Sequence, residues 1–276
     1  ISFKFAKYLY QMKKQTLFIP LLFILLSCGE YQKVLKSTDV NYKYVKAVEY
    51  YENEDFARAM PLFNELSTSM RGSKKAEAVS YYFAYCHYNN GDLLMSSYLF
   101  KNYVTTYPNG LHVEDCLFMS AYCIYMESPI YSLDATNTRK AIGEFQIFIN
   151  KYPNSSKVKE CNQLIDELRS KISHKAFENA KQYYTTENYK AAILSLNNVL
   201  IDFPGNKYRE KIHFLILKSS YQLAINSIST KIEERLNNTL DAYLVFNDNY
   251  PESEHSKQAE KIQLDTKQSL KKINKQ

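Results

Sequence analysis

One residue pattern recurs five times along this chain and constrains its fold more than any other feature. Each copy starts at a small or hydroxyl-bearing residue, and large apolar residues follow four and seven positions later, as Phe63 and Leu66 follow Ala59. These spacings place the three side chains on one face of a helix. In four copies a proline stands twelve positions after the small residue, where it ends the helix. The small residues, called reference residues below, are Ala59, Ser96, Ala141, Ala192 and Thr239, and the prolines are Pro108, Pro153, Pro204 and Pro251.

A second helix precedes each of these, and a short polar turn such as Asn53–Asp55 joins the two. Its small residue is Ala47, Ala84, Ala121 or Ala180 in the first four copies. Such a helix–turn–helix unit cannot bury its apolar face alone, so the copies must stack. The small residues, the aromatic residue and the closing proline resemble the tetratricopeptide repeat. We therefore predict an all-α fold, a right-handed α-solenoid of about five tetratricopeptide-like repeats over residues 43–251.

The repeats are longer than usual. Successive prolines are 45, 51 and 47 residues apart, against about 34 residues for a tetratricopeptide unit. Two insertions, Glu127–Thr138 and Ala224–Leu236, are predicted to lengthen the connections between the helices of repeats three and five. We assign N-terminal repeats one to three to residues 41–160, and C-terminal repeats four and five with a basic tail to residues 161–276.

The N-terminal segment reads as a lipoprotein leader. Lys13 and Lys14 precede an uncharged apolar run, Leu17–Leu26, which is followed by Ser27 and Cys28. The run is shorter than the about 20 residues that a membrane-spanning helix needs, and its flanks are those of a signal peptide. We predict a signal peptide at residues 12–27, cleavage between Ser27 and Cys28, and lipid (palmitate) on Cys28. Residues 1–11 would be an upstream over-read, and residues 28–40 a linker.

Charge gives no argument for nucleic acid as a partner. The four lysines before Cys28 account for most of the formal net charge of +6, so the mature chain is close to neutral, whereas nucleic-acid binding domains are strongly basic. Six lysines after Ser256 form a basic tail. They are either a solvated helix face or a contact for anionic lipid or an acidic partner.

Catalytic and metal-binding motifs are not found. The five histidines are scattered, with no HExxH pair for zinc and no GxSxG nucleophile elbow. His112, Glu114, Asp115 and Cys116 form the one cluster that resembles a catalytic or metal site. Acidic residues are, however, common in the first turn of a helix, where they interact favourably with its dipole. We expect no catalytic residue, no metal and no cofactor other than the lipid. The other four cysteines are expected to be buried thiols.

Tyrosine is abundant, with 25 copies and no tryptophan. Aromatic residues that recur at equivalent repeat positions, three before and four after the first-helix alanine, are expected to be packing. Tyrosines that do not recur are candidates for a peptide groove, because a phenol combines an apolar ring with a polar tip. These candidates are Tyr42, Tyr50, Tyr82, Tyr85 and Tyr122.

Together these features resemble one family. The lipidation signal at Cys28, the segment Tyr31–Leu35, the Tyr-Pro-Asn closures and the Ala-Tyr-Cys helices are similar to those of the BamD (YfiO-like) outer-membrane assembly lipoproteins. The resemblance implies a non-enzymatic scaffold, lipid-anchored to the outer membrane and facing the periplasm. Its C-terminal repeats would dock the central β-barrel assembly protein, BamA-like, with Asn226–Leu236 and the basic tail as candidate contacts. Its N-terminal repeats would receive unfolded outer-membrane protein precursors.

Two other classes stay open. One is a tetratricopeptide lipoprotein scaffold for cell-wall synthesis or envelope division. The other is a glycan-binding lipoprotein of nutrient uptake, which would use aromatic platforms in a similar way.

Overall fold

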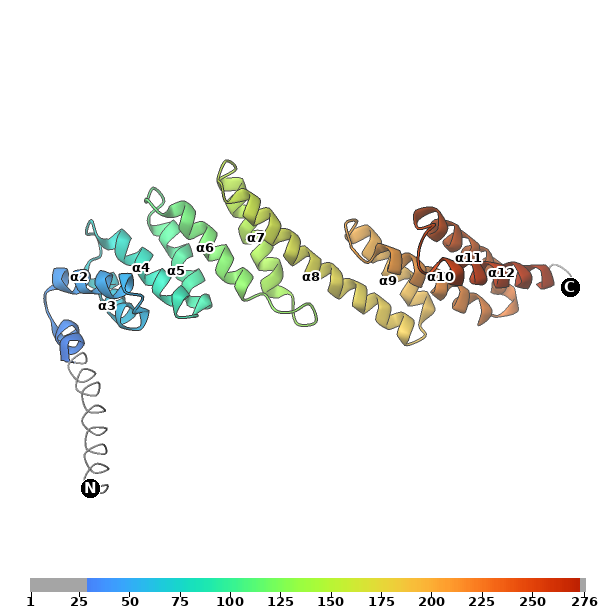
Figure 1. Cartoon of the computed structure of the whole chain (residues 1–276), viewed down its shortest axis with the longest axis horizontal. Coiled ribbons are helices and arrows are strands. Elements are labelled where there is room, and N and C mark those ends of the chain that lie inside the picture. Colours follow the sequence, from blue (N-terminus) through green and yellow to red (C-terminus); the bar gives the residue numbers. More distant parts are fainter. Residues whose placement is uncertain (1–28, 274–276) are drawn as a thin grey trace, which may run out of the picture. The chain divides into compact units, whose positions relative to one another are not determined.

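The computed structural model describes residues 29–273. The predicted leader, the cleavage site at Ser27 and the lipidation site at Cys28 lie outside the described residues. Helices α2–α12 follow one another along the chain, and no strand occurs between residues 29 and 273 (Figure 1). The predicted all-α, tetratricopeptide-like solenoid is confirmed. Over the same range, every helix is too short or too polar to span a bilayer. The chain divides into two compact units, which are described separately.

Unit 1 comprises residues up to 127 together with residues 143–161. It contains α2 (Val40–Glu52), α3 (Phe56–Ser69), α4 (Ala76–Asn89), α5 (Leu93–Thr106) and α6 (Val113–Met126), with most of α7 (Thr136–Lys151). Helices α2, α3, α4, α5 and α6 pack in chain order, and α2 also contacts α4. This is the stacking that the repeated apolar faces require.

Unit 2 comprises residues 128–142 and 162–276. It contains most of α8 (Val158–Thr185), then α9 (Tyr189–Asp202), α10 (Arg209–Ile225), α11 (Ser229–Asn249) and α12 (Ser256–Ile273). Helices α9, α10, α11 and α12 pack in chain order, and α10 also contacts α12. Helix α12 buries Ala259, Ile262 and Thr266 and turns its described lysines to solvent.

The repeat register predicts the core. All five reference residues are fully buried, and the large residues four and seven positions after them are at most 8% exposed. The four first-helix alanines are buried too. Small residues at these positions let the paired helices approach closely, and the large ones fill the space between repeats.

A recurring ring contact fastens each closing turn. The aromatic ring three positions before each first-helix alanine contacts a histidine, lysine or tyrosine side chain. That partner residue stands directly before the start of the next first helix. His112 stacks on Tyr81 at 4.1 Å between ring centroids, and Lys157 Nζ lies 4.1 Å from the Phe118 centroid. The other pairs are Lys75 on Tyr44, Tyr208 on Phe177, and His255 on Phe214 in the fifth repeat. The prediction that the recurrent aromatic residues pack is confirmed.

The turns within three helix pairs share one left-handed residue. Gly91 has φ of 79°, and Glu54 and Glu187 occupy the same place with φ of 59° and 60°. A side chain is strained in this region, whereas glycine is not. Asp55 and Asp92 then cap the following helices, accepting hydrogen bonds from the Arg58 and Met95 amides.

Three segments differ from the prediction. Ala224–Leu236 is not a long connection, because α10 runs to Ile225 and α11 begins at Ser229; residues 226–236 lack glycine and proline, so α11 is extended instead. The proline spacing of 51 reflects α8, a 28-residue helix. The expected linker is helical over residues 29–36, because Tyr31, Val34 and Leu35 form an apolar stripe that packs on α2 and α3.

Candidate functional site

The structure contains two apolar grooves at equivalent places in the repeat, one in each unit. The first groove, of about 440 Å³, lies where α3 meets α4 and α5. Its lining residues are Met60, Pro61, Asn64, Phe83, His87 and Met95. Thioether, aromatic and proline side chains make this a soft apolar surface that adapts to different side chains.

The second groove, of about 430 Å³, lies where α9 meets α10 and α11. Its floor is apolar, with Ile193, Leu194 and Leu223, and its described lining includes the cations Lys190 and Arg235 but no carboxylate. Met60 and Ile193 each follow a reference residue directly, and Asn64 and Asn197 each lie five positions after one. The two grooves are thus the same inter-repeat feature, but only the second carries a positive charge. An apolar segment with an adjacent acid matches it best.

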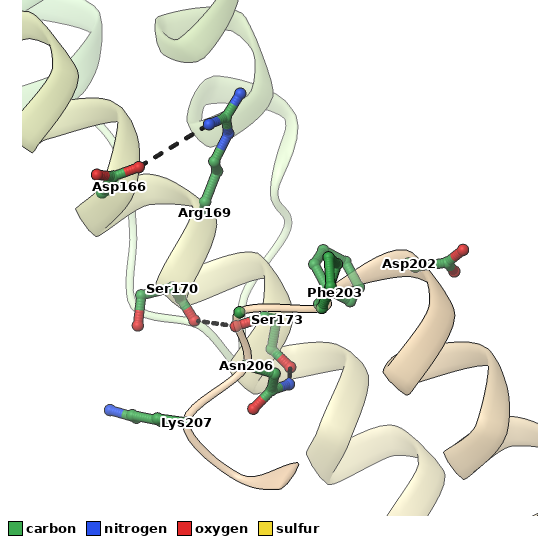
Figure 2. Close-up of a pocket in the computed structure, with 10 residues that line it drawn as sticks. Asp166, Arg169, Ser170, Ser173, Asp202, Phe203, Asn206 and Lys207 are labelled. Atoms are coloured by element: carbon green, nitrogen blue, oxygen red, sulfur yellow. Dashed lines mark hydrogen bonds and ion pairs between the residues drawn. The ribbon is translucent and has the colours of Figure 1, made fainter.

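A cleft of about 580 Å³ lies in unit 2 beside the turn Phe203–Lys207 (Figure 2). Ser173 stands seven positions before Ala180, as Glu77 and Glu114 stand before their alanines. In those earlier repeats the helix starts one residue before the acid, whereas α8 continues N-terminally from Ser173. The added turns flank the closing turn and form the cleft. Asp166 and Asp202 balance Arg169 and Lys207 along its edge, so it favours no charge.

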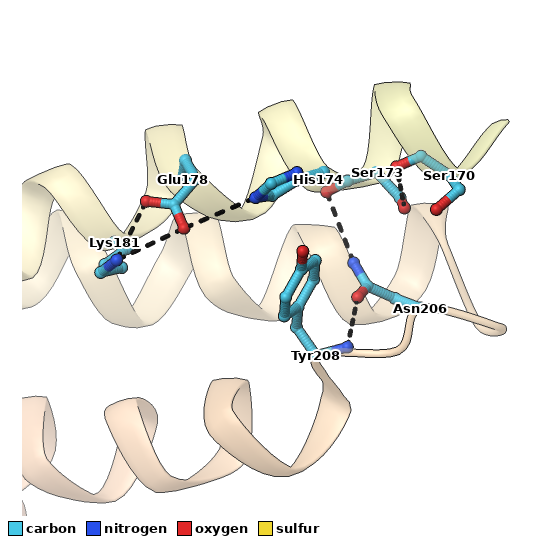
Figure 3. A network of polar contacts seen from close by, with 7 residues as sticks. All are labelled: Ser170, Ser173, His174, Glu178, Lys181, Asn206 and Tyr208. Atoms are coloured by element: carbon cyan, nitrogen blue, oxygen red, sulfur yellow. Dashed lines mark hydrogen bonds and ion pairs between the residues drawn. The ribbon is translucent and has the colours of Figure 1, made fainter. Parts of the chain in front are cut away.

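A polar network holds that turn against α8 (Figure 3). The Asn206 side chain donates to the Ser173 carbonyl at 3.5 Å and accepts from the Tyr208 amide at 2.7 Å. Tyr208 in turn stacks on Phe177. His174 stacks on Tyr131 at 3.7 Å, so the segment between α6 and α7 is tied to α8 as well. These contacts fix the closing turn against α8.

The predicted tyrosines are spread through unit 1 and do not line either groove. Tyr42 is 39% exposed. Tyr50 packs edge-on to Tyr31 at 5.7 Å, and Tyr82 lies on Phe63 at 5.5 Å. Tyr122 stacks on Phe118 and on Tyr125. The rings of Tyr50, Tyr82 and Tyr122 are therefore engaged in packing, whereas that of Tyr42 is exposed. Whether any of them contacts a peptide stays a prediction.

Tyr85 is tied to the acid cluster that the sequence singles out. Its hydroxyl donates to Asp115 Oδ2 at 2.5 Å, and Lys157 Nζ lies 3.3 Å from Asp115 Oδ1. Burial and this carboxylate raise the pKa of Tyr85 far above its ordinary value. Glu114 accepts from the Ser155 hydroxyl at 2.6 Å. The cluster thus joins neighbouring helices, and across residues 29–273 no three histidine, cysteine or acidic side chains are placed to hold a metal ion.

The four cysteines between residues 29 and 273 are buried free thiols, as predicted. Burial raises the pKa of Cys86 to about 12 and that of Cys123 to about 11. A thiol with so high a pKa is almost entirely protonated at neutral pH, so it is a poor nucleophile.

The residues that line the grooves were not predicted from the sequence. Met95, directly before a reference residue, is 43% exposed, and Leu194, two positions after one, is 64% exposed. Neither stands out alone, because single exposed apolar residues are common on protein surfaces.

The comparisons with known proteins identify a family. A sequence model of the YfiO family, described as an outer membrane lipoprotein, matches residues 36–236. This span runs from the end of the N-terminal helix into α11. None of the curated proteins matches the chain.

Proposed function

Because this chain belongs to the YfiO family of outer membrane lipoproteins, we propose that it is a non-enzymatic scaffold of the outer-membrane β-barrel assembly machinery. The resemblance expected from the sequence is confirmed at the level of the family. The observation that carries the scaffold role is the pair of register-equivalent grooves, one apolar and one apolar with cations. Two such grooves on one solenoid suit two different partners.

The second groove docks the central barrel protein in this proposal. Arg235 and Asn238 of α11 line it together with Lys190 of α9, so part of the segment 226–236 contributes as a helix and not as a loop. A partner segment with an acid beside an apolar residue would bury the apolar side chain on Leu194 and pair the acid with a cation. The exposed lysines of α12 offer a further contact of the same sign.

The first groove and the candidate tyrosines receive the precursor. Barrel precursors of this class end in an aromatic residue, as the family resemblance implies. An aromatic ring fits a groove built from Met60, Phe83 and Met95, because thioether–aromatic contacts are favourable. The exposed ring of Tyr42 would add apolar contact elsewhere on unit 1.

The chain reaches the membrane through lipid on Cys28 and faces the periplasm in this proposal. Several acyl chains on one cysteine hold a protein durably, because each buried methylene contributes about 0.8 kcal/mol. The near-neutral charge of the mature chain is consistent with protein partners.

Affinity purification of the lipoprotein from detergent-solubilised envelopes, followed by mass spectrometry, tests the proposal. We expect recovery of a large outer-membrane barrel protein with periplasmic repeat domains. Leu194→Lys should reduce that recovery at least tenfold, whereas Ile201→Lys should not, because Ile201 is 75% exposed on the same helix and lies outside the groove lining. Met95→Lys should instead weaken crosslinking to precursors, with Leu94→Lys as its matched control.

Other recoveries would overturn the assembly role. Cell-wall enzymes recovered with the wild type, and lost with Leu194→Lys, would favour the envelope-division scaffold. A nutrient transporter would favour the glycan-binding class. Equal loss with Leu194→Lys and Ile201→Lys would reject the second groove as the docking surface.

A further inference from the structure

The residues directly after the predicted lipidation site are already part of the folded core. Residues 29–36 are helical, and Val34 is fully buried in the cluster formed by α2 and α3. Tyr31 packs edge-on to Tyr50 at 5.7 Å, and its hydroxyl donates to the Arg58 carbonyl at 3.3 Å. The Arg58 guanidinium lies 5.8 Å from the Tyr31 ring centroid. Gly29 is bonded to Cys28, so no slack chain separates the anchor residue from the first repeat.

This helix has a defined direction along the first repeat. Residues 37–39 connect its end to the start of α2, so the helix runs back along α2. Glu30 lies 3.4 Å from Lys46, and Tyr31 contacts Tyr50 near the end of α2. Gly29, the first described residue, therefore lies at the end of the α2–α3 hairpin that carries the Asn53–Asp55 turn. The opposite end of the hairpin lies near Arg71.

The two ends of this hairpin carry opposite charge. Glu49, Glu52 and Glu54 are exposed near the turn that the anchor approaches, whereas Arg71 and Lys74 are exposed at the far end. A surface of anionic headgroups would attract the basic end and repel the acidic one. The covalent anchor therefore favours the Asn53–Asp55 turn at the membrane, whereas the charge favours the end near Arg71. Which orientation results depends on whether the helix of residues 29–36 stays packed.

We propose that residues 29–36 are a stiff mount that holds the first repeat upright on the phospholipid headgroups, with its Asn53–Asp55 turn facing the membrane. The proposal rests on the lipid that the proposed function places on Cys28. The mount works because releasing it would expose Val34 and separate Tyr31 from its ring partner, which costs burial energy. A loose tether would instead let the basic end settle onto anionic lipid.

Energy transfer to the membrane tests the orientation. The lipidated full-length protein is placed on vesicles of phosphatidylethanolamine and phosphatidylglycerol that contain a headgroup-linked acceptor dye. A donor dye is attached at Asn53→Cys or at Ser73→Cys, two exposed and uncharged positions, since the other thiols of the described chain are buried. The fourteen residues of α3 separate these ends by about 20 Å at 1.5 Å per residue. We expect transfer to be clearly stronger from position 53 than from position 73.

Two kinds of variant locate the cause. A Gly-Ser insertion between Gly29 and Glu30 keeps every contact of the mount but adds slack, so it should abolish or reverse the difference. Val34→Asp should do the same by releasing the helix, whereas Gln32→Asp, at an exposed position of the same helix, should keep the difference. Mass spectrometry of Cys28 accompanies each sample. Equal transfer from both positions with lipid present on Cys28 overturns the mount alone. An unmodified Cys28 in cell-derived protein overturns the lipid anchor and the mount with it.

Discussion

Glu77→Ala should destabilise unit 1 more than any other exchange of an acid at a helix start. Glu77 stands in the first turn of α4, and its Oε1 accepts from the Tyr103 hydroxyl at 2.5 Å and from the Leu111 amide at 2.7 Å. The Tyr103 ring is fully buried, and its oxygen also accepts from the His112 amide at 3.2 Å. One carboxylate thus ties the end of α5 and the closing turn back to α4.

The magnitude follows from these bonds. A hydrogen bond to a charged group contributes about 1.5–3 kcal/mol. Glu77 makes two such bonds and is partly exposed, so we expect Glu77→Ala to lower the free energy of unfolding by about 2–4 kcal/mol. Tyr103→Phe removes one of these bonds and also the bond that the hydroxyl accepts from the His112 amide, so it should cost about as much as Glu77→Ala. The double variant should reveal a coupling energy of about 1–2 kcal/mol between the two side chains.

Urea denaturation of the mature chain, followed by circular dichroism, measures these free energies. Glu114→Ala is the matched control, because Glu114 occupies the same place in α6 but bonds only the exposed Ser155 hydroxyl. It removes the same favourable charge at a helix start and should cost less than about 1 kcal/mol. Equal losses for the two acids, or no coupling between Glu77 and Tyr103, would refute this assignment.

Three further outcomes are expected. Glu187→Gly should raise the free energy of unfolding by up to about 1 kcal/mol by relieving a left-handed side chain, and Gly91→Ala should lower it; thermal unfolding shows whether the signs are opposite. Burial and the nearby Arg209 lower the pKa of His213. Below about pH 6.5 His213 is therefore protonated more readily in the unfolded chain than in the folded chain, and the free energy of unfolding falls. His213→Gln should reduce the difference between the free energies of unfolding measured at pH 7.5 and at pH 5.5. The buried thiols should react with a maleimide only in denaturant, and modification of native protein would contradict their burial.

The core was predictable because the same pattern of buried positions recurs in all five repeats. Spacings of four and seven leave little choice for residues such as Phe100 or Phe148, and both are fully buried. The length of α8 was harder to predict, because the proline spacing also allows a loop. Its signal was the lack of glycine and proline from Val158 to Thr185. The N-terminal helix likewise has an apolar stripe in its sequence. The stripe is hard to recognise because the segment is short and directly follows the predicted leader.

The grooves could not be predicted in the same way. Each one forms where side chains from three helices leave space, so its lining is a property of the packing and not of any single helix. Met60 and Met95 are 35 positions apart and meet only after two repeats stack. The candidate tyrosines were selected because they do not recur, but an aromatic residue outside the pattern can still pack on its neighbours, as Tyr82 does on Phe63.

Helix α12 covers the apolar face that α10 and α11 leave open. A row of stacked hairpins has no inherent last member, since each unit presents to the next the same kind of surface that it covers. Ala259 and Ile262 close that surface against Phe214 and Phe246, while the lysines on the other side of α12 face water. The helix thus has the form of a capping element, in which one face completes the core of the preceding repeat and the other is polar.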